Sequence, residues 1–400
     1  MNSKKINELF LKLIKILPLG IILRILNSKK KTPLKPQPSQ PSQPSQSPSS
    51  QIQKILFIKL EGMGDSVYLL EIINRLLENY PSLKIDVLTT GGNPIFPLFK
   101  DSFNKSYKSR YGVKVLKPLS PSSYYNTVKE INKENYDMIL DFTGMPVNVP
   151  LMLLFVQSSY KVGFDMLDLR KKSYGYTTAI DNKIHIFDNY LNLVKPFFSI
   201  SNEKKFTINF NTGAPEIGIA DDLKPDNENF INFVLSSSGG GNMDRRLPLE
   251  NSILLINLII KNFPNYKIYL LGGPTDYPYL EGLCGGLNLN GSPSATDIVS
   301  VKKTKNIPEA MELLKNSLFN ICIDSGLMHI SSLVNPNTYC LFGYSSPANS
   351  LPFNNIGYYA AEINCAPCSF YQISKCKTLE CMKKIDPKKI INDLKESRLK

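Results

Sequence analysis

The sequence predicts an α/β protein with two halves, each built on a parallel sheet, that face each other across a central cleft. Short apolar runs alternate with helical patterns after residue 54, the alternation restarts near residue 230, and glycine-rich turns follow several of the apolar runs. Strands that alternate with helices form parallel sheets. Ligands of such sheets bind beyond the carboxyl ends of the strands, so we expect the functional site between the two halves.

A basic amphipathic helix is expected over residues 1–31. Within residues 4–26, apolar side chains recur at helical spacing and lysines are interleaved. The longest uncharged run there, residues 16–23, is shorter than the roughly 20 apolar residues of a membrane-spanning helix. We interpret the segment as a helix on an anionic membrane surface, with a helix packed on a partner or on the body as the alternative.

A disordered linker is expected over residues 32–53, where proline, serine and glutamine dominate and the triplet Pro-Ser-Gln repeats. This composition cannot bury a core and stays extended. The preceding helix is therefore interpreted as a tether, and we expect the body to fold after deletion of residues 1–50.

The charge distribution argues against a nucleic-acid partner. The formal net charge is +13, but residues 1–54 carry +9 and residues 375–400 carry +5, whereas residues 55–374 carry only −1. A nucleic-acid binder needs a basic face on its folded body. We therefore assign the positive charge to an anionic membrane, and expect a cytoplasmic protein associated peripherally with the inner face of the membrane.

The first half is expected over residues 54–215. Residues 54–60 form an apolar run typical of a buried strand. The remaining expected elements are strands over 84–88, 113–116 and 136–142, helices over 67–77 and 121–134, and a turn with a buried helix within 142–160.

The second half is expected over residues 216–364, after a polar junction at 211–229. Its expected elements are strands over 230–235, 267–271, 318–323 and 338–342, and helices over 249–262, 308–316 and 325–334. Residues 365–400 contain a cysteine cluster and a helical tail.

The first glycine turn contains Gly62, Gly64 and Asp65 between a strand and a helix. Glycines allow close approach of the backbone to a ligand, and free N–H groups at the start of a helix favour an anion. Asp65 is either the N-cap of this helix or a functional carboxylate.

A second turn, residues 236–246, follows another strand. Its Ser237, Ser238 and Gly239 offer hydroxyl and N–H donors, and Arg245 and Arg246 come directly after it. Serine and glycine donors next to paired arginines are typical of a phosphate-binding site. A flexible surface loop with solvated arginines is the alternative.

The third segment is Asp324-Ser325-Gly326, which closes a strand and opens a helix. An aspartate at the carboxyl end of such a strand is well placed to bind sugar hydroxyls. His329 follows in the same helix, and we include it among the candidate donor-binding residues, although an isolated histidine is more often structural.

Four cysteines cluster near the C-terminus, namely Cys365, Cys368, Cys376 and Cys381. Two close pairs of soft ligands suit a closed tetrahedral zinc site with a structural role. Two disulfides or four ordinary thiols are the alternatives.

Four segments in order resemble glycosyltransferase family 9, the heptosyltransferases of lipopolysaccharide core assembly, over nearly the whole body from about Lys54 to about Leu394. These segments read KILFIKLEGMGDS (54–66), YDMILDFTGM (136–145), SSSGGGNMDRRLP (236–248) and NICIDSGLMHISSLVNPNTYCLFG (320–343). The last segment is the most specific. The resemblance implies a GT-B type fold, with two Rossmann-like domains, and an inverting transferase that binds a nucleotide-diphosphate sugar, usually ADP-heptose, mainly in the second half. An acceptor glycolipid or surface glycan is implied for the first half.

The resemblance also implies residue roles. Asp65 falls on the general base, Arg245 on the basic residue at the donor phosphates, and Asp324 on a contact to the transferred sugar. Ser325 and Gly326 fall on backbone donors to the diphosphate, and Asp276 aligns loosely with an acidic residue near the nucleoside. No Asp-x-Asp motif is present, so no cofactor is expected for catalysis.

Three departures from the family pattern leave the identity of the sugar open, and one of them is the N-terminal helix with its linker. Leu247 stands where the family has tryptophan, and Arg245 stands where lysine is usual. A non-catalytic protein of the same fold that binds a nucleotide sugar or a glycan is the alternative function.

Overall fold

The structure is a computed structural model of the chain. It describes residues 51–60, 62–90, 93, 95–96, 111–116, 121–143, 148–165, 173–208, 229–235, 245–287, 298–368, 376 and 378–398. The predicted N-terminal helix, the linker up to residue 50 and nearly all of the junction at 211–229 lie outside these residues. Ile52, at the end of the predicted linker, is buried in the core.

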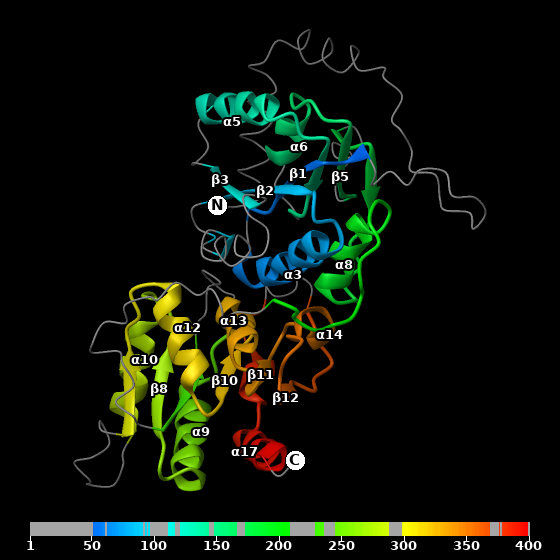
Figure 1. Cartoon of the computed structure of the whole chain (residues 1–400). Helices are drawn as coiled ribbons and strands as arrows, with labels where there is room; N and C mark the ends of the chain where they lie inside the picture. Colours follow the sequence, from blue (N-terminus) through cyan, green and yellow to red (C-terminus); the bar gives the residue numbers. More distant parts are fainter. Residues whose placement is uncertain are drawn as a thin grey trace.

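The first lobe is built on a six-stranded parallel sheet with the order β3-β2-β1-β4-β5-β6. Its strands are β1 (Lys54–Ile58), β2 (Lys84–Thr90), β3 (Tyr111–Leu116), β4 (Met138–Asp141), β5 (Tyr160–Phe164) and β6 (Tyr176–Thr178). Its helices are α3 (Met63–Asn79), α5 (Pro121–Lys133), α6 (Asn148–Leu153) and α8 (Ile186–Val194). In Figure 1, α5 and α6 lie above this sheet, whereas α3 and α8 lie on the side that faces the second lobe.

The second lobe repeats this plan, with the order β12-β11-β10-β7-β8-β9 in a second six-stranded parallel sheet. Its strands are β7 (Phe230–Val234), β8 (Lys267–Leu271), β9 (Val299–Lys302), β10 (Asn320–Ile323), β11 (Thr338–Phe342) and β12 (Gly357–Ala360). Its helices are α9 (Leu249–Asn262), α10 (Tyr277–Gly286), α12 (Ile307–Asn316), α13 (Gly326–Val334), α14 (Pro347–Ser350), α16 (Glu380–Lys383) and α17 (Pro387–Arg398). Both sheets have the strand order of doubly wound α/β folds, which confirms the predicted fold class.

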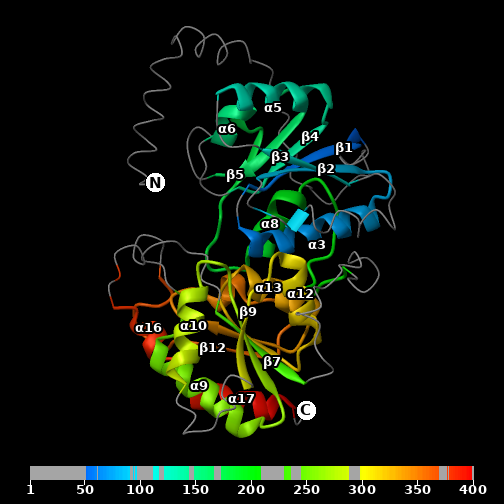
Figure 2. The same ribbon diagram turned by 90° about the vertical axis from the view of Figure 1, so that its left-hand side faces the viewer.

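Helix α3 is the layer between the lobes. Residues 66–77 of this helix are all buried, because one side packs on the first sheet and the other side contacts the second lobe. Its Val67 and Tyr68 share one apolar cluster with Met328 and Ile330 of α13. A helix that is buried all round is expected where it is covered on both sides, and Figure 2 shows α3 and α13 adjacent where the lobes meet.

The segment after α8 is fastened to α3 by a buried ion pair. Arg75 Nε donates to Glu71 Oε1 at 2.6 Å, and both side chains are buried. The Arg75 guanidinium also donates to the carbonyl oxygens of Ser201, Glu203 and Lys205. Since the charges are paired and their remaining hydrogen-bonding groups have backbone partners, the cost of burying them is offset.

Candidate functional site

Gly62 makes the turn that brings Asp65 to the lobe boundary. Its φ of +79° is a conformation that favours glycine, and a Cβ atom there would lie 3.0 Å from Asp65 Oδ2. The carbonyl oxygen of Gly62 accepts hydrogen bonds from the N–H and the hydroxyl of Ser66. Gly62 is the N-cap of α3, so the interpretation of Asp65 as the N-cap is wrong and its carboxylate is not used to cap the helix.

The Asp65 side chain is 41% exposed and has one buried neighbour that the sequence analysis missed. Lys59 Nζ lies 3.4 Å from Asp65 Oδ2, and the Lys59 side chain is only 7% exposed. A signal for this residue exists in the sequence, because Lys59 follows four apolar residues and precedes Leu60 in the run 54–60.

Asp324, Ser325 and Gly326 occupy the equivalent place in the second lobe, between β10 and α13. Ser325 is the N-cap of α13, but its side chain makes no capping hydrogen bond. Within the described residues, the buried Ser325 hydroxyl has no hydrogen-bond partner. An orphaned hydroxyl beside the N–H groups of a helix start is suited to an anionic oxygen.

Arg245 lies over the same turn. Its Nη1 donates to the Asp324 carbonyl oxygen at 2.9 Å and lies 3.2 Å from Asp324 Oδ2, while Nε donates to the Tyr344 hydroxyl at 2.6 Å. Burial by itself lowers the pKa of Arg245, but the charges of Asp324, Tyr344 and Asp65 and the hydrogen bond to Tyr344 raise it above its usual value. Arg245 therefore stays charged, and it lies within the electrostatic reach of Asp65.

The contact between the lobes runs through this site. The ring of His329 on α13 lies against Gly64, where an added Cβ would be 2.3 Å from His329 Cδ2. In the reverse direction, a Cβ on Gly326 would be 2.4 Å from Met63 Cε. Each lobe thus places a side chain against a glycine of the other lobe. The absence of a side chain at Gly64 and at Gly326 therefore makes room for the packing of the two lobes.

His329 is buried, and its Nδ1 lies 2.8 Å from the Tyr68 hydroxyl. Burial lowers its pKa, with Asp324 and Asp65 acting in the opposite direction. The structure therefore places His329 between the lobes, with one ring nitrogen bonded to Tyr68.

A second histidine contact lies nearby, at the start of α8. His185 Nε2 lies 3.0 Å from the carbonyl oxygen of Leu351, and Asn349 Nδ2 donates to the carbonyl oxygen of Ile184. The chain has only two histidines, and these contacts place both of them at the lobe interface.

Asp276 lies at the start of α10 and is 3% exposed. Its Oδ2 accepts from the N–H of Gly273 at 2.8 Å, and its Oδ1 is 4.0 Å from Arg246 Nη1. It therefore fixes the turn after β8. Ser237, Ser238 and Gly239 lie outside the described residues.

The cysteine cluster has free thiols at Cys365, Cys368, Cys376 and Cys381. Cys368 Sγ donates to the carbonyl oxygen of Cys365, and burial raises the pKa of Cys381 to about 11. Within the described residues, no group of three or more cysteine, histidine or acidic side chains is placed to hold a metal ion.

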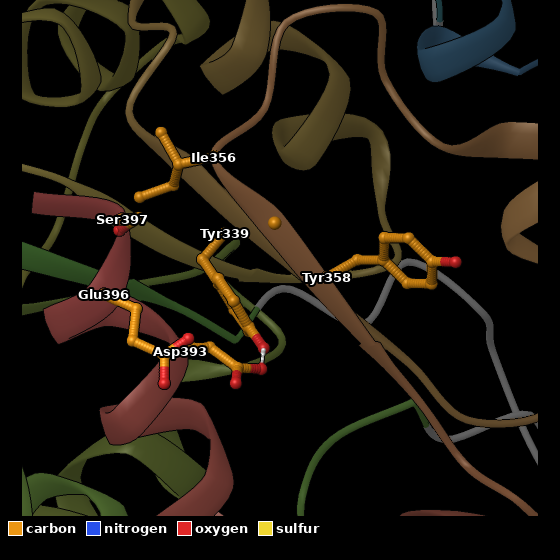
Figure 3. A pocket seen from close by; sticks show the side chains of 7 residues that line it. Tyr339, Ile356, Tyr358, Asp393, Glu396 and Ser397 are labelled. Atoms are coloured by element: carbon orange, nitrogen blue, oxygen red, sulfur yellow. Dashed lines mark hydrogen bonds between the residues drawn. The ribbon is translucent and has the colours of Figure 1, made fainter. Parts of the chain in front are cut away.

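A separate pocket lies between β12 and α17 (Figure 3). Tyr339 donates its hydroxyl hydrogen to Asp393 Oδ2 at 2.6 Å there, and the other lining residues are Ile356, Gly357, Tyr358, Glu396 and Ser397. None of the predicted site residues lines this pocket. In the part of the chain that the structure describes, we also find no helix long and apolar enough to cross a membrane.

Comparison with known proteins gives one family and one fold. The family model for glycosyltransferase family 9 (heptosyltransferase) matches residues 125–378. No curated protein matches the sequence significantly.

Three solved structures are similar to the chain. The heptosyltransferase WaaC of E. coli with ADP has a TM-score of 0.62 at 16% identity, covering 86% of this chain and 100% of its own. The ADP-heptose lps heptosyltransferase II of E. coli has a TM-score of 0.62 at 15% identity, covering 87% and 99%. A family 9 glycosyl transferase from Veillonella parvula DSM 2008 has a TM-score of 0.62 at 15% identity, covering 87% and 97%.

Proposed function

The chain belongs to glycosyltransferase family 9, and from this membership we propose that it is an inverting enzyme with Asp65 as its general base. Its two lobes form the GT-B fold of the solved relatives. The proposed reaction moves a sugar, heptose or a related one, from a nucleotide-diphosphate donor to a hydroxyl of a glycolipid or surface glycan.

The observation that carries the proposal is the position of Asp65 relative to Arg245 and the Asp324 turn. The Asp65 carboxylate is partly exposed, and its turn meets the Asp324 turn where Met63 lies against Gly326. A base on one side and anion-binding groups on the other are the two parts that a direct displacement at the anomeric carbon needs.

In the proposed step, the acceptor oxygen attacks the anomeric carbon while Asp65 takes the hydroxyl proton. The bond from that carbon to the diphosphate oxygen breaks, and the electron pair leaves with the nucleoside diphosphate. Arg245, the Ser325 hydroxyl and the N–H groups at the start of α13 stabilise the negative charge on this leaving group. A single displacement inverts the configuration at the carbon.

An ADP-sugar is the proposed donor. One solved relative contains ADP, and another is named an ADP-heptose lps heptosyltransferase. We therefore take ADP-heptose and heptose-free lipopolysaccharide as the first donor and acceptor to assay. Asp276 is proposed to act indirectly, by holding the turn near the nucleoside.

A ligand screen followed by turnover tests this function. Thermal unfolding with ADP-, UDP- and GDP-sugars identifies the donor, because a bound ligand raises stability by mass action. Asp65→Asn is then expected to lower the transfer rate roughly 100- to 10,000-fold while ADP still binds. Near wild-type transfer by Asp65→Asn contradicts the base assignment, and donor binding with no transfer by the wild type favours the non-catalytic alternative.

Membrane attachment through residues 4–26 is part of the proposal and places the enzyme at the cytoplasmic face. Its support is the basic amphipathic pattern and the +9 balance of residues 1–54. Flotation with vesicles containing anionic phosphatidylglycerol tests it. The full chain is expected to float at low salt and to be released at high salt, whereas a chain without residues 1–50 stays in solution.

A structural metal at the four C-terminal cysteines remains a proposal that rests on their spacing alone. Metal analysis of the purified protein tests it. One zinc per chain supports the site, and four titratable thiols without metal reject it.

A further inference from the structure

Lys59 is a buried cation at the catalytic end of β1. Its backbone N–H donates to the carbonyl oxygen of Leu88 and so continues the ladder of the sheet. Its side chain is 7% exposed. Burying an ammonium group is strongly unfavourable unless the group is paired, so the placement of this lysine requires a specific partner.

Asp65 is that partner. Lys59 Nζ lies 3.4 Å from Asp65 Oδ2, and within the described residues no other carboxylate pairs with this ammonium. The ring of Tyr190 on α8 lies on another side of it, with its centroid 5.4 Å from Nζ. The aromatic face adds a second favourable contact for the cation.

Gly62 leaves room for this pair. A Cβ on Gly62 would lie 3.0 Å from Asp65 Oδ2 and 3.5 Å from Lys59 Nζ. The positive φ of Gly62 and its missing side chain therefore allow the ammonium and the carboxylate to meet inside the turn.

The pair leaves the other carboxylate oxygen available. Only Oδ2 of Asp65 has a hydrogen-bond partner among the described residues, and the side chain is 41% exposed. With Oδ2 paired with a buried ammonium group, Oδ1 is the carboxylate oxygen that is left for an acceptor hydroxyl.

We propose that Lys59 is a positioning residue, which orients the Asp65 carboxylate so that its free oxygen meets the acceptor hydroxyl. This rests on the proposed role of Asp65 as the base. Lys59 touches neither substrate in this assignment and acts only through Asp65. A displacement of about 1 Å at a reacting group costs roughly 100-fold in rate, so the loss of the ammonium is expected to lower kcat.

The test measures kcat and KM of the full chain with ADP-heptose, or the donor found by the screen, and heptose-free lipopolysaccharide. Lys59→Met is expected to lower kcat about 10- to 100-fold and to leave KM for both substrates within about twofold. Lys59→Arg keeps the charge and is expected to retain more activity than Lys59→Met.

A double-mutant cycle separates positioning from a general effect on the fold. A general base contributes roughly 100- to 10,000-fold, so Asp65→Asn is expected to leave a residual rate that can be measured with excess enzyme. In that background Lys59→Met is expected to change nothing further, because the group it orients is already lost. The proposal is overturned if Lys59→Met lowers kcat by the same factor in the wild type and in Asp65→Asn. It is also overturned if the kcat of Lys59→Met is within twofold of the wild type.

Lys54→Met is a matched control at the opposite end of the same strand. Lys54 also pairs with a carboxylate, Glu134 at 2.5 Å, and also lies over a tyrosine ring, that of Tyr136. It is remote from Asp65 and is expected to keep wild-type kcat. If Lys59→Met does not fold, Lys59→Arg replaces it in the double-mutant cycle. Lys59→Arg is then expected to lower kcat in the wild type and to leave kcat of Asp65→Asn unchanged.

The two proposals fail in different ways. If Asp65→Asn loses at least about 100-fold in kcat and Lys59→Met keeps wild-type kcat, the base assignment stands and the positioning role is wrong. If Asp65→Asn keeps near wild-type kcat, the base assignment is wrong and the role of Lys59 is rejected with it.

Discussion

The Tyr68 hydroxyl on α3 lies 2.8 Å from Nδ1 of His329 on α13, and this hydrogen bond joins the two lobes. Both side chains are buried. Burial raises the pKa of Tyr68 well above its usual value and lowers that of His329, so both groups are neutral at pH 7. A hydrogen bond between two neutral groups therefore holds α3, the helix that carries Asp65, against α13, the helix that follows Asp324.

Tyr68→Phe removes this bond and leaves Nδ1 of His329 without that partner in the interior. We expect the free energy of unfolding to fall by about 1–3 kcal/mol, measured by urea denaturation. Tyr80→Phe is the control, because its hydroxyl bonds to the Ser199 backbone at an exposed site, and its loss should stay below about 1 kcal/mol. Equal losses of unfolding free energy for the two variants would show that the inter-lobe hydrogen bond contributes no more stability than the exposed one.

Gly64→Ala tests the close packing of the lobes. The added methyl group would meet the His329 ring at 2.3 Å, so the ring or the lobe must shift, at a cost of about 1–3 kcal/mol in unfolding free energy. Gly282→Ala in α10 is the control, since nothing lies within 4 Å of its Cβ position. Alanine there should stabilise the helix by up to about 1 kcal/mol. Thermal unfolding measures both variants, with a lower melting temperature expected for Gly64→Ala and an equal or higher one for Gly282→Ala.

His185 makes stability depend on pH in mildly acidic solution. Burial, the main cause, lowers its pKa to about 4, with the Leu351 carbonyl and Asp188 acting in the opposite direction and Lys204 and His329 in the same direction. Between pH 6.5 and pH 4 the unfolded chain therefore binds the proton and the folded chain does not. Stability is fully present above pH 6.5 and decreases as the pH falls through 4, by about 3 kcal/mol in total.

Urea denaturation from pH 7 to pH 4 measures this slope. His185→Asn removes the titration and keeps an N-cap side chain for α8, whose cap is now His185. The slope of this variant should be clearly smaller than that of the wild type, and identical slopes would refute the role of His185.

The Arg75–Glu71 pair should be sensitive to removal of one partner. Arg75→Met leaves the buried Glu71 without its ion-pair partner, which should cost about 3–5 kcal/mol in urea denaturation. The double variant Arg75→Met, Glu71→Leu removes both charges and should recover much of that loss. A double variant as unstable as the single one would show that the backbone hydrogen bonds of Arg75, rather than its charge pairing, dominate.

Arg245→Ala should weaken ADP binding. A charge-assisted hydrogen bond to phosphate contributes about 1.5–3 kcal/mol, so the Kd measured by calorimetry should rise roughly 10- to 100-fold. Lys261→Ala, which removes an exposed positive charge on α9, should leave the Kd unchanged. An unchanged Kd for Arg245→Ala would remove this residue from the donor site.

Most of the core strands were predictable because each is a short apolar run. The strands β1, β2, β8 and β11 lie where the pattern places them. Strands β5, β6, β9 and β12 were missed. Three of them, β6, β9 and β12, are at the edges of the two sheets, where partial exposure removes the need for an apolar run. Helix α10 was missed because its Pro278 and its three glycines weaken the helical pattern.

The site was only partly predictable. Local turns place Asp65 and Asp324 at strand ends, since a parallel strand followed by a helix always presents its carboxyl end there. The partners of these residues come from elsewhere in the chain, such as Tyr344 for Arg245 and Tyr68 for His329. Their sequence separation is large, so no local pattern signals these contacts.

The order of apolar runs and glycine turns was therefore enough to predict two parallel sheets, because those features depend on local burial and backbone conformation. The family came from the resemblance of four sequence segments. The structural role of the glycines in the two turns depended on how the lobes pack. Gly64 and Gly326 serve the contact between lobes, with His329 and Met63 filling the space beside them. The pairing of Lys59 with Asp65 likewise required the turn at Gly62 to fold back over the end of β1, since a charge on a buried strand is stable only where the fold supplies its counter-charge.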